Sequence, residues 1–211
     1  MHYQTFLYDN HEYRCDIMTA IVDRLNAMAH HFARVFVVRL DITFPTTYRS
    51  TGTSEEISKL MKRLVEIYTA NPSDLSKRVM MHYVVVREKN ESTDHHYQSN
   101  NPHYHLVLMF DGSKEDNGWT VLSHAENILT RIVGEAVKGC IQLCDSQFSR
   151  HDGIKIQKPK KESRDGVMEA EQADFNLAYS SVVKWLMYLA KTDTKESCPF
   201  RAKNFFCSRL T

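Results

Sequence analysis

The stretch NPHYHLVLMF (residues 101–110) decides how the chain folds. Successive side chains of a β-strand point to opposite faces of the sheet. Tyr104, Leu106 and Leu108 therefore share an apolar face, while His103 and His105 share the other. Two explanations of this pattern are open. The histidines could be hydrogen-bonded groups at the end of a plain buried strand, or they could be two ligands of a divalent-metal site.

A partner strand is predicted immediately before this one. RVMMHYVVVRE (residues 78–88) is rich in β-branched and apolar residues, and the polar segment 89–102 connects the two strands. Antiparallel pairing across this connection places Glu88 roughly opposite His103, so its carboxylate is a candidate third ligand. His82 has the same parity as Glu88 but lies roughly 20 Å away, at about 3.3 Å per residue, and is expected in the core.

Other donors are weaker candidates for the same site. His95 and His96 belong to the polar connection and could swing inward, and Asp41 on an earlier strand could add a carboxylate. A ligand set of two histidines and a carboxylate suits Mn²⁺ or Mg²⁺ as the working metal, although such sites also bind other divalent ions tightly.

The order of the surrounding elements predicts an α+β domain. RVFVVRLDITFP (residues 34–45) has the composition of a strand, and Thr53 followed by Glu56 has the spacing of a helix capping box. A second covering helix ends at Gly139, and one more strand follows it. We expect a ferredoxin-like βαββαβ antiparallel sheet with both helices on one face and the C-terminal helix beside the other, open face. The predicted elements are strands at 34–45, 78–88 and 103–110, a strand at either 140–145 or 154–157, and helices at 15–31, 53–71, 120–139 and 174–191.

The last predicted helix carries a tyrosine on its polar side. At about 100° per residue, the apolar residues of 174–191 form one face, and Tyr188 lies opposite, within the same arc as Lys184 and Lys191. This pattern fits a solvated surface. It also fits a tyrosine nucleophile, because adjacent cations favour the phenolate and neutralise a phosphate. Tyr179 lies closer to the apolar face and is expected to be structural.

Composition limits the possible classes of protein. The chain has 211 residues, of which 42% are hydrophobic and 25% charged, as in one ordinary domain spanning 1–211. Its net charge is only +1, with the basic excess in the C-terminal third. No apolar run approaches the roughly 18 residues of a membrane span, and the first ten residues do not resemble a signal peptide. We therefore expect a cytoplasmic protein with no membrane partner.

Three short motifs in this order resemble those of a known family. PHYH (residues 102–105) resembles motif 2 of the HUH endonucleases, which include rolling-circle replication initiators and relaxases. FVVRLDITFP (residues 36–45) resembles their motif 1 strand, and YLAK (residues 188–191) resembles the YxxK form of motif 3. The ending KNFFCSRL (residues 203–210) is similar to that of an inovirus and prophage replication-protein group within this family.

The resemblance implies a function and a set of site residues. His103, His105 and Glu88 would hold Mn²⁺ or Mg²⁺, and Tyr188 would attack single-stranded DNA to leave a 5′-phosphotyrosine, assisted by Lys191 and Lys184. The expected substrate is a single-stranded or supercoiled DNA origin of a phage, prophage or plasmid-like element. Because no GxxxxGK[ST] stretch is present, a host or element helicase would unwind the DNA in trans. The expected contacts to the DNA backbone are those of Lys155, Lys158, Lys160 and Lys161.

Two alternative functions remain open from the sequence. A nickase that acts on the DNA of a competing element would need the same site as a replication initiator. An RRM-like module would use the same open sheet face to bind nucleic acid without catalysis, although no RNP1-like pattern is present. In the catalytic interpretation the chain divides into an N-terminal helical extension (1–33), a sheet core (34–158) and a helix bearing the tyrosine (174–195).

Overall fold

The computed structural model has the expected α+β class. It describes residues 4–44, 48–50, 53–69, 78–88, 101–134, 139–146, 153–160, 165–192 and 204–210. The strands are β1 (Thr5–Tyr8), β2 (His11–Arg14), β3 (Arg34–Thr43), β4 (Met81–Glu88), β5 (His103–Asp111), β6 (Ile141–Leu143), β7 (Ile154–Gln157) and β8 (Phe205–Cys207). The helices are α1 (Cys15–His31), α2 (Glu55–Thr69), α3 (Gly118–Val133), α4 (Asp165–Leu186) and the 3₁₀ helix η2 (Met187–Ala190).

The main sheet is antiparallel and has β5 at its centre. Its strand order is β6-β3-β5-β4-β8, and β7 also pairs with β3. Both candidates for the last predicted strand are therefore strands, β6 beside residues 40–42 and β7 beside residues 34–37 of β3. The predicted pairing of β4 with β5 is confirmed, because Glu88 is the partner of His103.

Helices α2 and α3 cover the sheet face that Tyr104, Leu106 and Leu108 share, as predicted. The second covering helix is shorter than the predicted 120–139. Asn117 caps its start by accepting hydrogen bonds from the N–H groups of Trp119 and Thr120, and Gly134 ends it in the left-handed conformation, at φ 75°.

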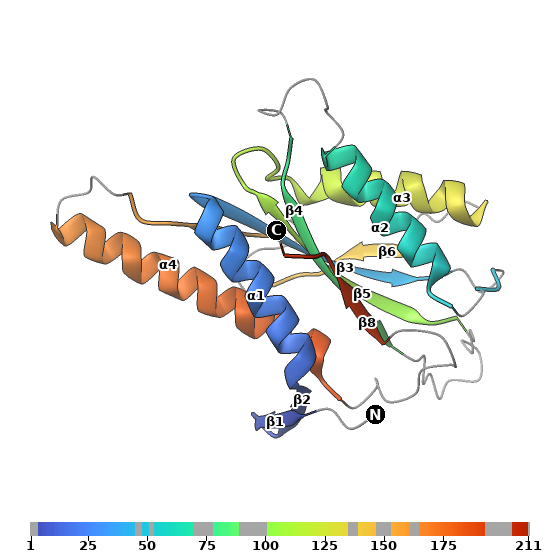
Figure 1. Ribbon diagram of the computed structural model, residues 1–211, viewed down its shortest axis with the longest axis horizontal. Helices are drawn as coiled ribbons and strands as arrows, with labels where there is room; N and C mark the ends of the chain where they lie inside the picture. Colours follow the sequence, from blue (N-terminus) through green and yellow to red (C-terminus); the bar gives the residue numbers. More distant parts are fainter. Residues whose placement is uncertain are drawn as a thin grey trace.

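The opposite face of the sheet is not open, because α1 and α4 lie over it. Figure 1 shows these two helices together on one side of the sheet and α2 with α3 on the other. Val107 and Met109 of β5 are completely buried in this second core, packed with Leu25 of α1 and Leu186 of α4. The RRM-like alternative needs an exposed sheet face, and most of this face is covered.

Within the described part of the chain, no helix has the length and apolar character needed to cross a membrane.

The first core supplies a test of the fold. Leu106 is completely buried under α2 and α3, so Leu106→Ala removes packed atoms and leaves a cavity. We expect a loss of about 3 kcal/mol in the free energy of unfolding, measured by chemical denaturation. Leu7→Ala, at a side chain that is 76% exposed in β1, is the control and should change it by less than about 0.5 kcal/mol. Equal losses in the two variants would contradict this packing.

Candidate active site

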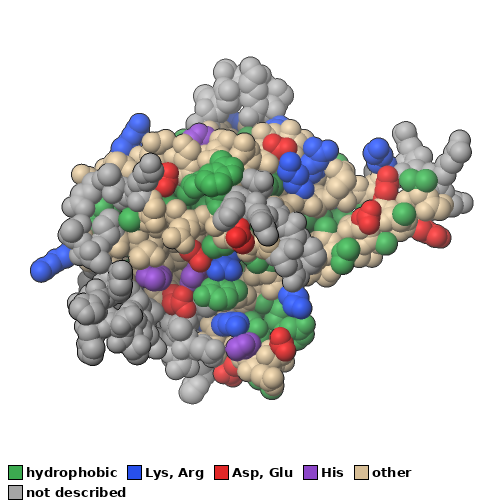
Figure 2. All heavy atoms as spheres, turned by 180° about the vertical axis from the view of Figure 1, so that it is seen from behind, with side chains coloured by type: hydrophobic (Ala, Val, Ile, Leu, Met, Phe, Trp, Pro, Cys, Tyr) green, Lys and Arg blue, Asp and Glu red, His purple; other side chains and the backbone are tan. Residues whose placement is uncertain are grey.

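Four side chains from three neighbouring strands gather at one end of the second sheet face. Asp41 of β3 is the cross-strand partner of His105, and Glu88 of β4 is the partner of His103. Because directly paired residues point to the same side of a sheet, all four project together. This face assignment of His103 and His105 agrees with the sequence prediction. Figure 2 shows histidine, acidic and basic side chains gathered on the face seen from behind.

His105 lies between two carboxylates. Its Nδ1 is 2.7 Å from Oδ1 of Asp41, and its Nε2 is hydrogen-bonded to Oε2 of Glu88. The residue is only 4% exposed. Burial alone would lower the pKa of His105, but the two hydrogen-bonded carboxylates outweigh it and raise the pKa above its usual value. In the protonated imidazole both ring nitrogens donate, Nδ1 to Asp41 and Nε2 to Glu88. The proton on Nε2 then occupies the position between His105 and Glu88.

The pKa values of Asp41 and His103 are shifted by different surroundings. Burial acts to raise the pKa of Asp41, but the hydrogen bond and charge of His105, together with Arg39, hold it at about 2. Burial lowers the pKa of His103, and the charge of Glu88 opposes this only in part. His103 is therefore neutral at neutral pH, the form in which an imidazole binds a metal.

Arg39 of β3 belongs to the same site and was missed in the sequence. It is 8% exposed, and its Nη2 lies 3.1 Å from Oδ2 of Asp41. Its guanidinium carbon is 4.2 Å from the centre of the Tyr188 ring, while its buried Nε has no hydrogen-bond partner among the described residues. A signal was present, since Arg39 and Asp41 are two charged residues of equal parity within the otherwise apolar run from Val35 to Ile42.

Tyr188 lies against this group of side chains. Its ring meets the ring of His105 edge-on, with the centroids 5.3 Å apart, and the residue remains 40% exposed. Burial and the charge of Glu88 raise the pKa of its phenol, and Arg39 acts in the opposite direction. The structure thus places a partly exposed phenol beside a guanidinium and an imidazole.

The segment around Tyr188 differs from the predicted helix 174–195. Helix α4 begins at Asp165 and ends at Leu186, and Tyr188 belongs to η2. Lys191 follows η2, with its Nζ 5.9 Å from the centre of the Tyr188 ring. Lys184, by contrast, is exposed and lines a separate depression together with Tyr8 and Met187. The change to a 3₁₀ helix separates the two lysines that a continuous α-helix would have aligned.

An N-terminal hairpin fixes the tyrosine segment in place. Region 1–33 was expected to be a helical extension, but strands β1 and β2 precede helix α1 there. Lys191 forms a β-bridge with Tyr13, and the N–H of Thr192 donates to the carbonyl of Glu12 at 3.0 Å. Tyr179, expected to be structural, donates from its hydroxyl to Asn26 of α1 at 2.6 Å. These contacts hold η2 against the sheet.

Of the lysines predicted to contact DNA, Lys155 lies on β7, paired with Phe36 of β3, and Lys158 and Lys160 follow that strand. Lys155 is paired with Asp116 at 2.8 Å, and Nζ of Lys158 donates to the carbonyl of His30 at 3.0 Å. Lys160 is exposed, and Lys161 lies outside the described residues.

Of the other candidate histidines, only His82 is described, and it does not join the site. His82 is 3% exposed and its Nδ1 lies 2.8 Å from the hydroxyl of Ser208, as expected for a core histidine. His95 and His96 lie outside the described residues.

The described residues contain no group of three or more His, Cys, Asp or Glu side chains already arranged to hold a metal ion. The chemistry of the donors nevertheless fits a divalent cation. A metal-binding histidine commonly donates its second ring N–H to a carboxylate, which is what Nδ1 of His105 does with Asp41. Nε2 of His105 and Glu88 would then be ligands in place of the proton they share, with His103 beside them. In that arrangement Asp41 would orient the histidine instead of supplying a ligand.

Comparisons with known proteins give one match. No curated protein and no solved structure is significantly similar to this chain. Neither result tests the resemblance to the HUH endonucleases, which stays a prediction. A family model described as the YagK/YfjJ C-terminal domain matches residues 1–208. The chain therefore belongs to the YagK/YfjJ C-terminal domain family.

Proposed function

We propose that this protein is a DNA endonuclease that nicks a single strand with Tyr188 as the nucleophile. The observation that carries the proposal is the position of Tyr188, which packs against His105 and Arg39 while 40% of the residue stays exposed. A phenol buried for packing alone would not need a buried guanidinium at its face and a carboxylate-bound imidazole at its edge. Both groups suit an anionic reaction centre.

The proposed step is a transesterification that needs no further reactant. The phenol oxygen of Tyr188 bonds to the phosphorus of the scissile phosphate as its proton leaves. The bond from phosphorus to the 3′ oxygen breaks, and that oxygen takes up a proton. The products are a 5′-phosphotyrosine and a free 3′-OH, and the phosphodiester energy is kept in the covalent intermediate.

Arg39 and Lys191 supply positive charge at the tyrosine. The guanidinium of Arg39 lies over the ring, where it favours the phenolate and restricts the ring to one orientation. Within the described part of the chain the buried Nε has no hydrogen-bond partner, and a phosphate oxygen that entered the site would supply one. Lys191 adds a second cation from the other end of η2.

Mn²⁺ or Mg²⁺ bound by His105, Glu88 and His103 would polarise an oxygen of the scissile phosphate. The role of the protein is to orient the ligands, and Asp41 does this by accepting the hydrogen bond of Nδ1 of His105.

The biological setting that we propose is the start of rolling-circle replication of a phage, prophage or plasmid-like element in the cytoplasm. The substrate would be single-stranded or supercoiled origin DNA, opened by a helicase in trans. An enzyme directed at the DNA of a competing element would use the same residues in the same way.

The first prediction concerns the nucleophile. Incubation of the purified protein with supercoiled or single-stranded DNA and Mn²⁺ should give a protein–DNA adduct that survives denaturing electrophoresis. Tyr188→Phe should reduce adduct formation by about three orders of magnitude or more, because the attacking oxygen is absent. Tyr179→Phe removes a hydroxyl of α4 that donates to Asn26 of α1, and this variant should retain the adduct. An adduct of normal yield in Tyr188→Phe would exclude this nucleophile.

The second prediction concerns the metal. EDTA should abolish nicking and Mn²⁺ should restore it. His105→Ala and Glu88→Gln should each weaken Mn²⁺ binding, measured by calorimetry without DNA, by about tenfold to a hundredfold. His30→Ala, at an exposed histidine of α1, should bind Mn²⁺ like the wild type. Unchanged Mn²⁺ affinity in the two site variants would rule out this ligand set.

The third prediction concerns Arg39. Arg39→Ala should slow adduct formation about a hundredfold at saturating DNA, because charge beside the phenol is lost. Arg39→Lys keeps the charge but loses the planar stacking, so its rate should be intermediate. Rates are compared well below the unfolding midpoint of each variant. Equal rates for Arg39→Lys and Arg39→Ala would show that charge at this position is unimportant.

A further inference from the structure

A groove runs between α2 and α3 on the outer surface of these helices, on the opposite side of the sheet from the candidate active site. Its volume is about 920 Å³. The residues that line it all belong to these two helices: Lys59, Lys62, Arg63, Glu66, Ile67, Ile128, Arg131 and Ile132. None of them takes part in the proposed nicking reaction, so the groove needs an explanation of its own.

The floor of the groove is apolar. Ile67 of α2 is 48% exposed, although it is a large hydrophobic residue, and Ile128 and Ile132 of α3 line the groove with it. Exposed apolar surface bordered by charged residues is typical of a place where another protein binds. The three isoleucines therefore call for an apolar partner surface.

The sides of the groove are basic, with four cations against one carboxylate. Lys59 and Arg63 each form an ion pair within α2, at 2.7 and 2.6 Å. In the part of the chain that the structure describes, Lys62 of α2 and Arg131 of α3 form none. Because these two residues come from different helices, each side of the groove offers an unpaired positive charge. The matching partner surface has carboxylates around an apolar centre.

The first half of α4 projects from the body of the protein, and we call residues 166–178 the arm. Figure 1 shows this end of α4 extending away from the sheet, and Figure 2 shows acidic and hydrophobic side chains along the projecting part. Between positions 165 and 183 the sequence has four acidic residues and no Lys or Arg. The arm is thus opposite in charge to the groove.

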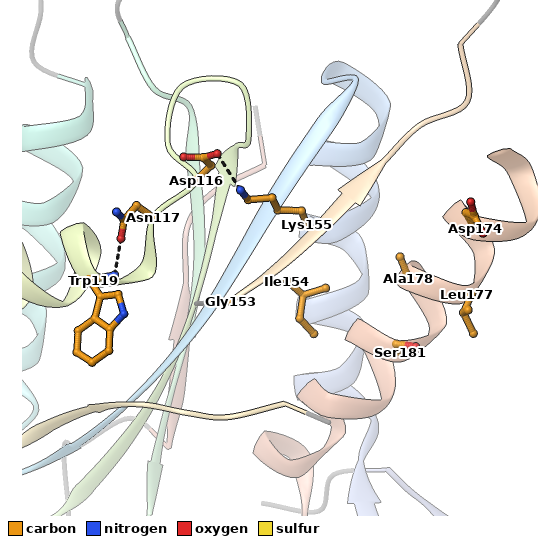
Figure 3. Close-up of a pocket in the computed structure, with 10 residues that line it drawn as sticks. All are labelled: Asp116, Asn117, Trp119, Gly153, Ile154, Lys155, Asp174, Leu177, Ala178 and Ser181. Atoms are coloured by element: carbon orange, nitrogen blue, oxygen red, sulfur yellow. Dashed lines mark hydrogen bonds and ion pairs between the residues drawn. The ribbon is translucent and has the colours of Figure 1, made fainter. Parts of the chain in front are cut away.

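One side of the arm faces the body, but only in part. Glu171 accepts a hydrogen bond from the N–H of Lys160, and Phe175 packs against the second core. A hollow of about 650 Å³ lies between β7 and the stretch of α4 that carries Asp174 and Leu177, as Figure 3 shows. The rest of the arm is left in contact with solvent.

The exposed side of the arm carries an apolar stripe. At about 100° per residue, Val167, Ala170 and Leu177 fall within an arc of about 80°. Val167 is 52% exposed and Leu177 is 63% exposed. On the same helical wheel Glu169 and Asp174 lie on either side of Ala170 and Leu177. Both carboxylates are exposed, and neither forms an ion pair with the described residues. This stripe is the complement of the groove.

The arm and the groove also match in length. At about 1.5 Å per residue, the arm spans roughly 20 Å and the 15 residues of α2 span roughly 22 Å. A helix laid along the groove could therefore pack against α2 and α3 over its whole length. The arm cannot enter the groove of its own chain, because the two lie on opposite sides of the sheet (Figure 1).

We propose that the arm of one molecule docks in the groove between α2 and α3 of a second copy of this chain. The apolar stripe covers the three isoleucines, and Glu169 and Asp174 face Lys62 and Arg131. Because two different surfaces meet, the contact is heterologous and successive copies join head to tail. For a contact of this size we expect a dissociation constant on the order of 10 µM. The inference goes beyond the nicking reaction and does not depend on it.

Two variants, each with one altered surface, test the proposal. Asp174→Asn/Leu177→Gln alters the arm and Lys62→Gln/Ile67→Gln alters the groove, in both cases at exposed residues. Sedimentation is measured at about 100 µM, in EDTA and without DNA. Wild type should form species larger than a dimer, since the concentration is roughly ten times the expected dissociation constant. Each variant alone should lose affinity by on the order of a hundredfold and sediment mainly as a monomer.

Mixing the two variants gives the decisive result. An equimolar mixture has one intact arm for one intact groove, so it should form a dimer and nothing larger. Leu7→Gln, at an exposed side chain of the N-terminal hairpin, is the control and should assemble like the wild type. Far-UV circular dichroism shows that each variant is folded.

Three outcomes would each overturn the proposed contact. The first is a wild type that stays monomeric at this concentration, which is the result expected if the groove bound DNA or a different acidic protein. The second is assembly of either variant alone as in the wild type, and the third is a mixture that stays monomeric. Because neither DNA nor metal is present, none of these results bears on the nicking reaction.

Discussion

The site depends on one imidazole that joins three strands. His105 lies on the central strand β5 and is hydrogen-bonded to Asp41 of β3 and to Glu88 of β4. Two carboxylates this close and this well buried would repel each other and lose hydration, and the two ring nitrogens offset both costs. Arg39 is held through Asp41, and the tyrosine ring rests on the imidazole edge. Removing this one ring would therefore release all of its neighbours at once.

The parts of this arrangement that follow from strand geometry could be predicted from the sequence. Alternation along residues 103–110 placed the histidines on the face opposite Tyr104, and the hairpin register placed Glu88 beside His103. Simple register could not tell which histidine the carboxylate would bind. The long side chain of Glu88 reaches diagonally to His105, whose ring lies between Asp41 of β3 and Glu88 of β4.

Other features depended on tertiary contacts that local patterns do not contain. On an ideal α-helix Lys184 and Tyr188 share one side, as predicted from the sequence. In the structure α4 is followed by a 3₁₀ helix that contains Tyr188, and Lys191 after it forms a β-bridge with Tyr13 of β2. The C-terminal helix was expected beside the second sheet face, but the packing of α1 on the same strands was not, because no pattern within residues 15–31 indicates which surface they cover. Arg39 was overlooked because its strand was interpreted as core, although a guanidinium in an apolar strand needs a charged neighbour.

The bridge between the N-terminal hairpin and the tyrosine segment also orders events in time. The contact between Glu12 and Thr192 joins residues 180 positions apart in sequence. During synthesis the hairpin leaves the ribosome first and residues 187–192 leave it much later. For most of synthesis the hairpin therefore lacks the segment that it binds in the folded protein. Long-range closure of this kind is slow to form. A nascent chain therefore carries the histidine strand before Tyr188 is held in place, and the proposed site would be complete only after residues beyond Ala190 have emerged and docked.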